Sequence, residues 1–200
     1  MKKFVSLLLA LTMVLALFAG CASEKPAETT VPETTAAPVP ETSSLEIMQT
    51  IWDSYVKNVG EDMLFPVAGG DMDHSAMDAA GIVDVKNADY MGNILNVPAE
   101  LHAQIDDAAN LMHMMNANTF TGAAYHVVAG TDVNAFVKTL SDGIKGTQWM
   151  CGFPDQLVVA TLYGEYVVAF YGNIDLINLF KAQLTTAYAD AVIVVEESLA

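Results

Sequence analysis

The order of apolar patterns after residue 118 constrains the fold of this chain more than any other feature. Segments rich in small, aromatic and β-branched residues predict four strands, over residues 120–129, 157–163, 166–171 and 191–195. The middle two are separated by Gly164 and Glu165, which is hairpin spacing. Two amphipathic helices are predicted between the others, one capped by Thr131 or Asp132 and one capped by Asn173. The last strand is apolar throughout, so we expect it to be buried.

This β-α-β-β-α-β order is that of a ferredoxin-like, or split βαβ, arrangement. It predicts an α+β domain with a four-stranded antiparallel sheet covered on one face by two helices. An open sheet of another α+β type is the alternative, and a strand over 150–156 would change the topology.

The preceding part, residues 45–118, is predicted to be mainly helical. Ser43 and Glu46 have capping-box spacing, and the helix that they begin ends at Gly60. The helical periodicity fails over 61–80, and residues 69–73 are predicted to be an irregular loop. A second helix is expected to begin at Pro98. Its apolar stripe would contain Leu101, Ile105, Ala108, Met112 and Met115.

Residues 1–20 have the layout of an export signal, with Lys2 and Lys3 before an apolar run over 4–18. A membrane span needs about 20 apolar residues, so this run is short. It ends in Ala19, Gly20 and Cys21, and here the chain resembles the bacterial lipoprotein signal, although it has Phe18 where leucine is commonest.

The lipoprotein resemblance implies that Cys21 is diacylated and becomes the new N-terminus. The protein would then be held on the extracytoplasmic face of the cell membrane through a diacylglyceryl anchor. An ordinary secretory signal with a chance cysteine, or an uncleaved anchor, is the alternative.

Residues 21–44 change abruptly to Thr, Pro, Glu, Ala and Ser, and the sequence of 31–34 recurs at 39–42. Such a segment has too little apolar surface to offset its ordering entropy, so it predicts a disordered linker. At roughly 3 Å per residue its reach is up to about 70 Å. The exported domain, residues 45–200, would stand clear of the lipid surface.

The charge of the chain excludes one class of partner. It has 24 acidic residues against 8 lysines and no arginine, a net charge of −16. A nucleic-acid-binding domain needs a basic surface, so no nucleic-acid partner is expected. The 53% hydrophobic content suffices for one core.

The exported domain resembles a family of small, uncharacterised lipoproteins of Gram-positive bacteria. The resemblance covers residues 88–189 and rests on 90–97 before a helix, 114–116 before a strand, and Pro154 with Asp155. It implies architecture and location only, because the family has no established activity. Relatives are sometimes labelled bacteriocin-transport accessory proteins, a label associated with thioredoxin-like proteins.

A thioredoxin-type site needs two cysteines two residues apart, and Cys151 has no such partner. With Cys21 acylated, Cys151 would be the one free thiol of the mature protein. A cysteine nucleophile with His126 as its base stays open. We favour a small buried hydrophobic residue in a turn, since free cysteine is commonly buried.

Methionine and histidine suit Cu(I), and residues 112–115 contain the best cluster of them. On the predicted helix, however, Met112 and Met115 belong to the core face, which leaves only His113 and Met114 as candidate ligands. We favour core packing here.

The loop 70–78 has oxygen ligands at alternate positions, beginning with Asp71 and Asp73, and His74 and Asp78 are further candidate ligands. It lacks the spacing and closing glutamate of an EF-hand. We favour a solvated turn in which Asp73 or Ser75 caps a helix. Calcium or zinc is the alternative.

No phosphate-binding loop, serine nucleophile motif or zinc-ligand spacing is found. The tyrosines Tyr163, Tyr166 and Tyr171 are either packing residues or a contact face. We therefore expect no cofactor and a non-enzymatic module that binds a small ligand or an envelope protein. The alternatives are an exported copper-handling protein and a thiol enzyme using Cys151.

Overall fold

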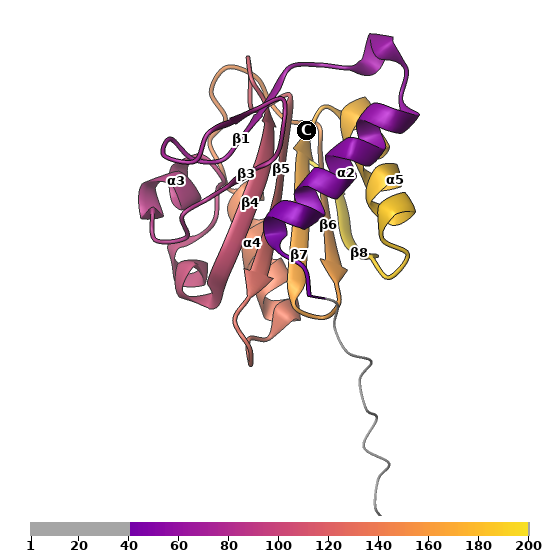
Figure 1. Ribbon diagram of the computed structural model, residues 1–200. Coiled ribbons are helices and arrows are strands. Elements are labelled where there is room, and N and C mark those ends of the chain that lie inside the picture. The colour runs from indigo at the N-terminus through magenta and orange to yellow at the C-terminus, as the bar shows by residue number, and fades with distance from the viewer. Residues whose placement is uncertain (1–40, 200) are drawn as a thin grey trace, which may run out of the picture. The chain divides into compact units, whose positions relative to one another are not determined.

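One antiparallel sheet of eight strands carries the domain in the computed structural model, which describes residues 41–199 (Figure 1). The strands are β1 (Val67–Gly69), β2 (Ala76–Met77), β3 (Gly81–Ile82), β4 (Ile105–His113), β5 (Phe120–Val127), β6 (Gln156–Leu162), β7 (Tyr166–Gly172) and β8 (Val192–Ser198). The order across the sheet is β2-β1-β4-β5-β7-β6-β8, and β3 also pairs with β4.

The helices are α2 (Ser44–Asn58), α3 (Ala88–Asn93), α4 (Val133–Lys145) and α5 (Ile174–Ala187), with 3-10 turns η1 (Glu61–Met63) and η2 (Ala99–Gln104). The α+β class is confirmed, as is the order β5-α4-β6-β7-α5-β8 in the second half. The predicted signal, Cys21 and all but the last few residues of the linker lie outside the described residues.

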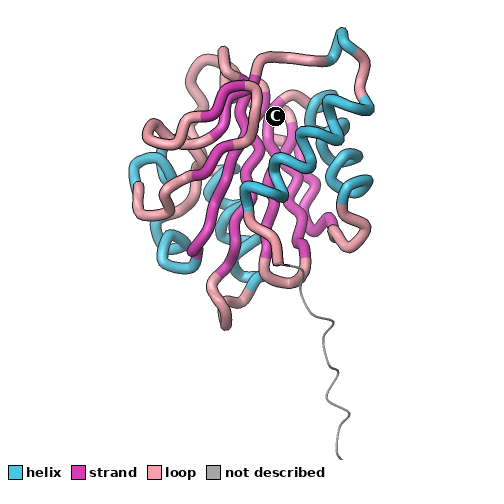
Figure 2. Tube along the Cα trace, viewed as in Figure 1, coloured by secondary structure: helices cyan, strands magenta, loops and turns pink. Residues whose placement is uncertain are grey.

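The helices α2, α4 and α5 begin at predicted caps. Figure 2 shows the helices in cyan among the magenta strands. The side chain of Ser43 accepts a hydrogen bond from the backbone N–H of Glu46. Asp132 and Asn173 cap α4 and α5 in the same way. Each cap satisfies backbone donors that the first turn of a helix leaves unpaired.

Helices cover both faces of the sheet, which corrects the expectation of two helices on one face. On β7, Val168 and Phe170 pack toward α2 and α5, whereas Val167 and Ala169 pack toward α4. Figure 1 shows α2 and α5 in front of the sheet and α4 behind it. The two β-α-β connections step in the same direction across the sheet from antiparallel strands, so connections of the same hand must use opposite faces.

The first half of the domain contains strands where helix and loop were expected. The predicted helix after Pro98 is only η2, and the chain then extends as β4, whose Ala108 and Ala109 are fully buried on opposite faces. Segment 61–80 contains η1, β1 and β2, and the predicted irregular loop at 69–73 is found between β1 and β2, beginning after Gly69. Small residues on β4 leave room for the side chains of the two cores that pack against its opposite faces.

The strand β8 is at an end of the described sheet, so the expectation that it is buried is wrong. Val192 and Val194 are 57% and 43% exposed, while Ile193 and Val195 pack against the two cores. No strand lies beyond β8 in the described sheet, which leaves one edge to solvent.

Candidate functional site

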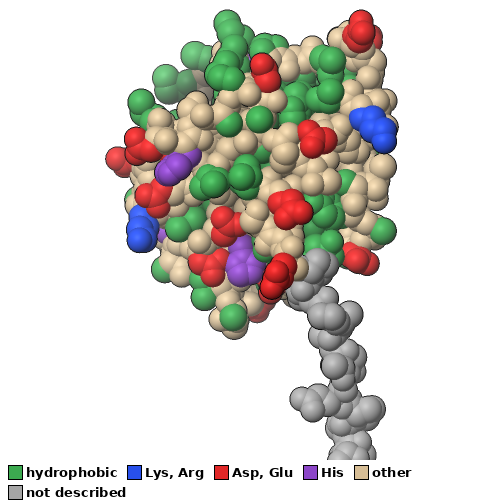
Figure 3. All heavy atoms as spheres, in the orientation of Figure 1, with side chains coloured by type: hydrophobic (Ala, Val, Ile, Leu, Met, Phe, Trp, Pro, Cys, Tyr) green, Lys and Arg blue, Asp and Glu red, His purple; other side chains and the backbone are tan. Residues whose placement is uncertain are grey.

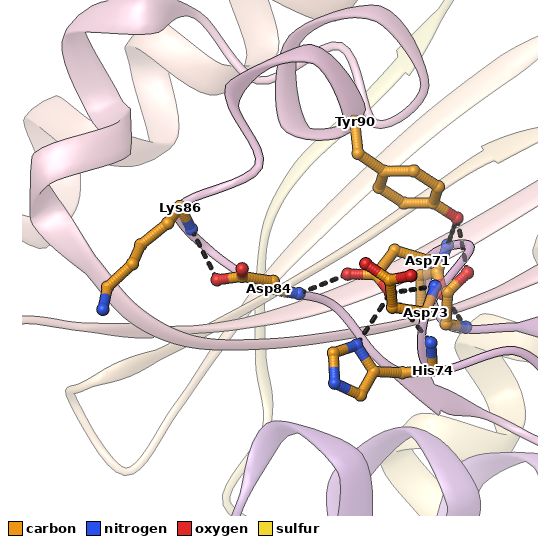
Figure 4. Close-up of polar contacts among 8 residues, drawn as sticks. Asp71, Asp73, His74, Asp84, Lys86 and Tyr90 are labelled. Atoms are coloured by element: carbon orange, nitrogen blue, oxygen red, sulfur yellow. Dashed lines mark hydrogen bonds and ion pairs between the residues drawn. The ribbon is translucent and has the colours of Figure 1, made fainter.

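The buried carboxylate of Asp71 accepts several hydrogen bonds within residues 70–84 (Figure 4), and we call residues 70–78 the acidic loop. Its Oδ1 accepts from the backbone N–H groups of Asp73 and His74 at 3.1 and 3.0 Å, and its Oδ2 accepts from that of Asp84 at 2.7 Å. The Nδ1 atom of His74 lies 2.7 Å from Oδ1. Burial by itself raises the pKa of Asp71, but these hydrogen bonds outweigh it and the pKa is lowered.

A buried polar network then fixes this loop to the sheet. Asn110 on β4 is fully buried; its Oδ1 accepts from the N–H of Gly70 at 2.6 Å and its Nδ2 donates to the hydroxyl of Tyr90 at 2.9 Å. The Tyr90 hydroxyl donates to the carbonyl of Gly70 at 2.7 Å. A Cβ atom on Gly81 would lie 2.3 Å from the backbone nitrogen of Gly70. The two backbone segments can therefore approach this closely only because residue 81 is glycine.

These contacts assign the acidic loop a structural role. Asp73 and Asp78 are exposed, and residues 41–199 contain no group of three or more His, Cys, Asp or Glu residues that could hold a metal ion. The expectation of a helix cap at Asp73 or Ser75 is wrong, since no helix begins there and Asp71 is the acceptor.

The methionine and histidine cluster at residues 112–115 lies at the end of β4 and in the loop after it, not on a helix. This corrects the expected core position of Met115. The side chains of Met114 and Met115 are 45% and 77% exposed. His113 stacks on Phe65 with 5.2 Å between ring centroids, and its Nδ1 accepts from the N–H groups of Met115 and Asn116.

Cys151 is a free and exposed thiol, so the interpretation as a buried residue is wrong. Its φ of 78° lies in the left-handed region, and its carbonyl accepts from Nδ2 of Asn116 at 3.4 Å. His126 is far from it: it pairs with Tyr166 at the opposite end of β5, where its ring contacts Asp106. The structure therefore brings no histidine base from this position to Cys151.

Two loops, β4–β5 and α4–β6, are tied together near Cys151. Besides the bond from Asn116, Nδ2 of Asn118 donates to the carbonyl of Gly152 at 2.9 Å. The two tied loops carry four exposed apolar side chains, which we call the loop surface: Met114, Met115, Met150 and Phe153, at 45%, 77%, 78% and 72% exposure. Figure 3 shows hydrophobic side chains gathered at the top of the view, over the ends of β4 and β5.

The loop surface lies at the end of the sheet opposite to the point where the chain enters the domain. Thr42, near the start of the described chain, accepts from the hydroxyl of Tyr166 at 2.7 Å, at one end of β7. Gly172, at the other end of β7, pairs with Phe120, just beyond Asn118. At about 3.4 Å per residue the two ends of β7 are about 20 Å apart.

A hollow of about 390 Å³ beside these tied loops, which we call the amide cleft, is lined only by uncharged side chains. The lining residues are Asn93, Ile94, Asn96, Asn116, Ala117, Asn118, Thr147, Gln148, Trp149, Met150, Cys151 and Tyr171. Burial raises the pKa of Tyr171 to about 12, which keeps this wall neutral.

A second hollow of about 400 Å³ shares Asn116 and Asn118 with the amide cleft. Asp155 lines it, but Oδ2 of this carboxylate accepts from the N–H of Ile174 at 3.2 Å and so serves the first turn of α5.

A third hollow, of about 650 Å³, is a groove between α2 and residues 64–66. Trp52 lines it and donates from Nε1 to the carbonyl of Asp78 at 3.0 Å, with Asp53 and Lys57 at the rim.

The tyrosines near the β6–β7 hairpin are mainly packing residues. Tyr166 and Tyr171 are only 5% and 3% exposed, and Tyr163 is half-buried in the turn. Of the two interpretations of these residues, packing is confirmed for Tyr166 and Tyr171.

Comparison with protein-family models, curated proteins and solved structures found no match to this chain. Within residues 41–199, the longest apolar helices fall short of what a membrane crossing requires.

Sequence reasoning missed the amide cleft altogether. Its walls come from four separate segments, 93–96, 116–118, 147–151 and Tyr171, and nothing in the sequence says that these meet. The one available signal was the pair Asn116 and Asn118 in a turn between apolar segments, where asparagine side chains commonly bond to backbone.

Proposed function

We propose that this protein is a lipid-anchored, extracytoplasmic binding module without enzymatic activity, which meets a ligand or an envelope partner at the loop surface. The anchor is the diacylglyceryl group on Cys21, at the end of the linker. The observation that carries the proposal is the exposure of Met114, Met115, Met150 and Phe153 on two loops held together by side-chain amides.

Clustered apolar side chains of this size are costly to leave in water and commonly mark a contact site. Methionine adapts its shape to a partner, and aromatic side chains are enriched at interface centres. The position of the loop surface also supports the proposal, because the chain enters the domain about 20 Å away, at the other end of β7. A tether attached there would direct the loop surface away from the membrane.

Photo-crosslinking in intact cells tests this function. A benzophenone amino acid replaces Phe153 in one variant and Lys138 in the control; the Lys138 side chain is 77% exposed on α4. We expect a discrete adduct from position 153 that is lost when Met150→Asp is added, and none from position 138. Equal adduct yields from both positions would contradict the proposal.

A soft-metal role is the second candidate, because three exposed thioethers and one thiol lie on the same tied loops: Met114, Met115, Met150 and Cys151. Such ligands suit Cu(I). Isothermal titration with Cu(I) under reducing conditions tests it: a saturable site that Met115→Leu weakens would favour this role, and heats no larger than those of dilution would eliminate it.

A further inference from the structure

The amide cleft is uncharged in a domain that carries 20 acidic residues and 5 lysines over residues 45–200, a net charge of −15. We infer that the amide cleft is a binding site for a neutral oligosaccharide. The inference rests on the proposed function and names the ligand class that the loop end of the domain would take.

Two amides in the cleft are held rigidly and keep unused hydrogen-bonding capacity. Asn96 donates from Nδ2 to the hydroxyl of Tyr171 at 2.9 Å and accepts at Oδ1 from the hydroxyl of Thr147 at 3.1 Å. Asn118 donates to the carbonyl of Gly152, and its Oδ1 accepts no hydrogen bond from any described residue. Each amide has two donors and two lone pairs, so each can serve a ligand without moving. Groups fixed in advance lose little entropy on binding.

Two further amides stand at the rim of the cleft. Asn93 and Gln148 are exposed, and the side chains of both are without hydrogen-bond partners among residues 41–199. A side-chain amide presents a donor beside an acceptor, which matches two neighbouring hydroxyl groups of a sugar ring.

An aromatic wall supplies the apolar part of the match. Trp149 is half-buried and its ring centroid lies 5.5 Å from that of Tyr171, which fixes the indole against the wall. The C–H faces of sugar rings pack on such flat apolar surfaces while their hydroxyls reach polar neighbours. A volume of about 390 Å³ is within the usual range of ligand sites.

Charge selects against anionic polymers. The cleft contains no lysine, the chain contains no arginine, and the field of an acidic domain repels polyanions. Extended peptides commonly use exposed strand edges or deep apolar grooves, whereas this cleft offers side-chain amides between loops. A neutral oligosaccharide is the class that fits both the polarity and the missing charge.

The test is titration of the mature chain from residue 21, with Cys21→Ser, by three neutral hexasaccharides: chitohexaose, cellohexaose and maltohexaose. Hexagalacturonate serves as the anionic probe and an uncharged hexapeptide as the peptide probe. Amide shifts in ¹⁵N spectra locate binding, and the rate at which a maleimide labels Cys151 gives a second readout, since Cys151 lines the cleft. We expect at least one neutral hexasaccharide to shift residues of the cleft and to slow the labelling of Cys151.

The variants exploit the two kinds of amide. Asn93→Ala with Gln148→Ala removes exposed side chains that make no hydrogen bond to residues 41–199, so we expect folding to be preserved. The affinity should fall about tenfold, or 1.4 kcal/mol. Asn134→Ala is the matched control, because Asn134 is an exposed asparagine on α4, outside the cleft. The inference is overturned by any of three results: no shift with any neutral hexasaccharide at about 10 mM, well above the weak millimolar range; equal binding of the acidic or peptide probe; or equal affinities of the double variant and Asn134→Ala. A position-153 adduct in cells without oligosaccharide binding would reject the ligand class and leave the proposed function standing.

Discussion

Replacing Asp71 by asparagine should destabilise the domain strongly although the side chains are nearly equal in size. The Asp71 carboxylate is 3% exposed and accepts three backbone N–H groups through its two oxygens. Asparagine has only one acceptor oxygen, so its NH₂ group must face either the N–H of Asp84 or those of Asp73 and His74. At least one charge-assisted hydrogen bond is lost and a buried donor is left unpaired.

The magnitude follows from these contacts. A hydrogen bond to a charged group contributes about 1.5–3 kcal/mol, and an unsatisfied buried donor costs a similar amount, so we expect a loss of about 3 kcal/mol. For a domain of this size that corresponds to a fall in Tm of about 6–12 °C. Urea unfolding followed by circular dichroism measures the free energy of unfolding directly.

The pH dependence gives a second signature. Because the pKa of Asp71 is lower in the folded than in the unfolded chain, its contribution to stability is present above the unfolded value of about 3.9 and is lost as the pH falls through the folded value. The difference in stability between the natural protein and Asp71→Asn should therefore shrink below about pH 3.9.

The matched control is Asp73→Asn, whose carboxylate is exposed in the same loop and should change stability by at most about 0.5 kcal/mol. Equal effects of the two substitutions at pH 7, or a difference that does not change with pH, would refute the structural role of Asp71.

Three further predictions address the anchor, the glycine crossing and the buried tyrosines. Cys21→Ser should leave the protein unprocessed or released into the medium; a variant of unchanged mass that still partitions into detergent would contradict lipidation. Gly81→Ala should cost several kcal/mol, about 3 or more by comparison with other strained or overpacked sites, because its Cβ would meet the nitrogen of Gly70 at 2.3 Å; Gly92→Ala, with no atom closer than 4.0 Å, is the control in the same urea assay. In an absorbance titration Tyr171 should stay protonated at pH 11, since burial raises its pKa to about 12, and the stability that this contributes should be lost as the pH rises from about 10 toward 12; full ionisation of all tyrosines by pH 11 in the folded protein would contradict its burial.

The second half of the domain was predictable because its signals are local. The side chain of Asn173 caps α5 by accepting a hydrogen bond from the backbone N–H of Asp175, two residues further on. The turn between β6 and β7 has left-handed φ values of 56° at Tyr163 and 78° at Gly164. A cap or a tight turn depends on a few consecutive residues, so the sequence alone indicates it.

The first half was not predictable because pairing across the sheet decides it. The apolar positions of 101–115 match a helical stripe, yet β4 is held extended by β5 on one side and by β1 and β3 on the other. The buried network is equally non-local, since Asn110 bonds to Gly70, 40 residues away. Long-range contacts of this kind override local propensity.

The candidate site shows the same division. The sequence predicts a free thiol in a turn at Cys151, but it does not show that the side-chain amide of Asn116, 35 residues away, donates a hydrogen bond to the carbonyl of Cys151. A helix over 101–115 would place Met115 in the core, but this part of the chain is the strand β4, which ends at His113, and Met115 is exposed in the loop after it. The acidic loop was recognised as a solvated turn, whereas the buried role of Asp71 depends on the N–H of Asp84.

The thiol of Cys151 lies between Met150 and Phe153 in the same loop. It therefore offers the most direct measurement of the central claim, that the loop surface is occupied in the cell. A membrane-impermeant maleimide would label Cys151 in intact cells and in purified protein, and the thiol introduced by Lys138→Cys in a Cys151→Ser background would correct for access through the envelope. We predict that the ratio of labelling in cells to labelling of purified protein is about tenfold lower for Cys151 than for the control thiol, as expected of a site occupied about 90% of the time. Equal ratios at the two positions would show that nothing covers the loop surface and would contradict the account.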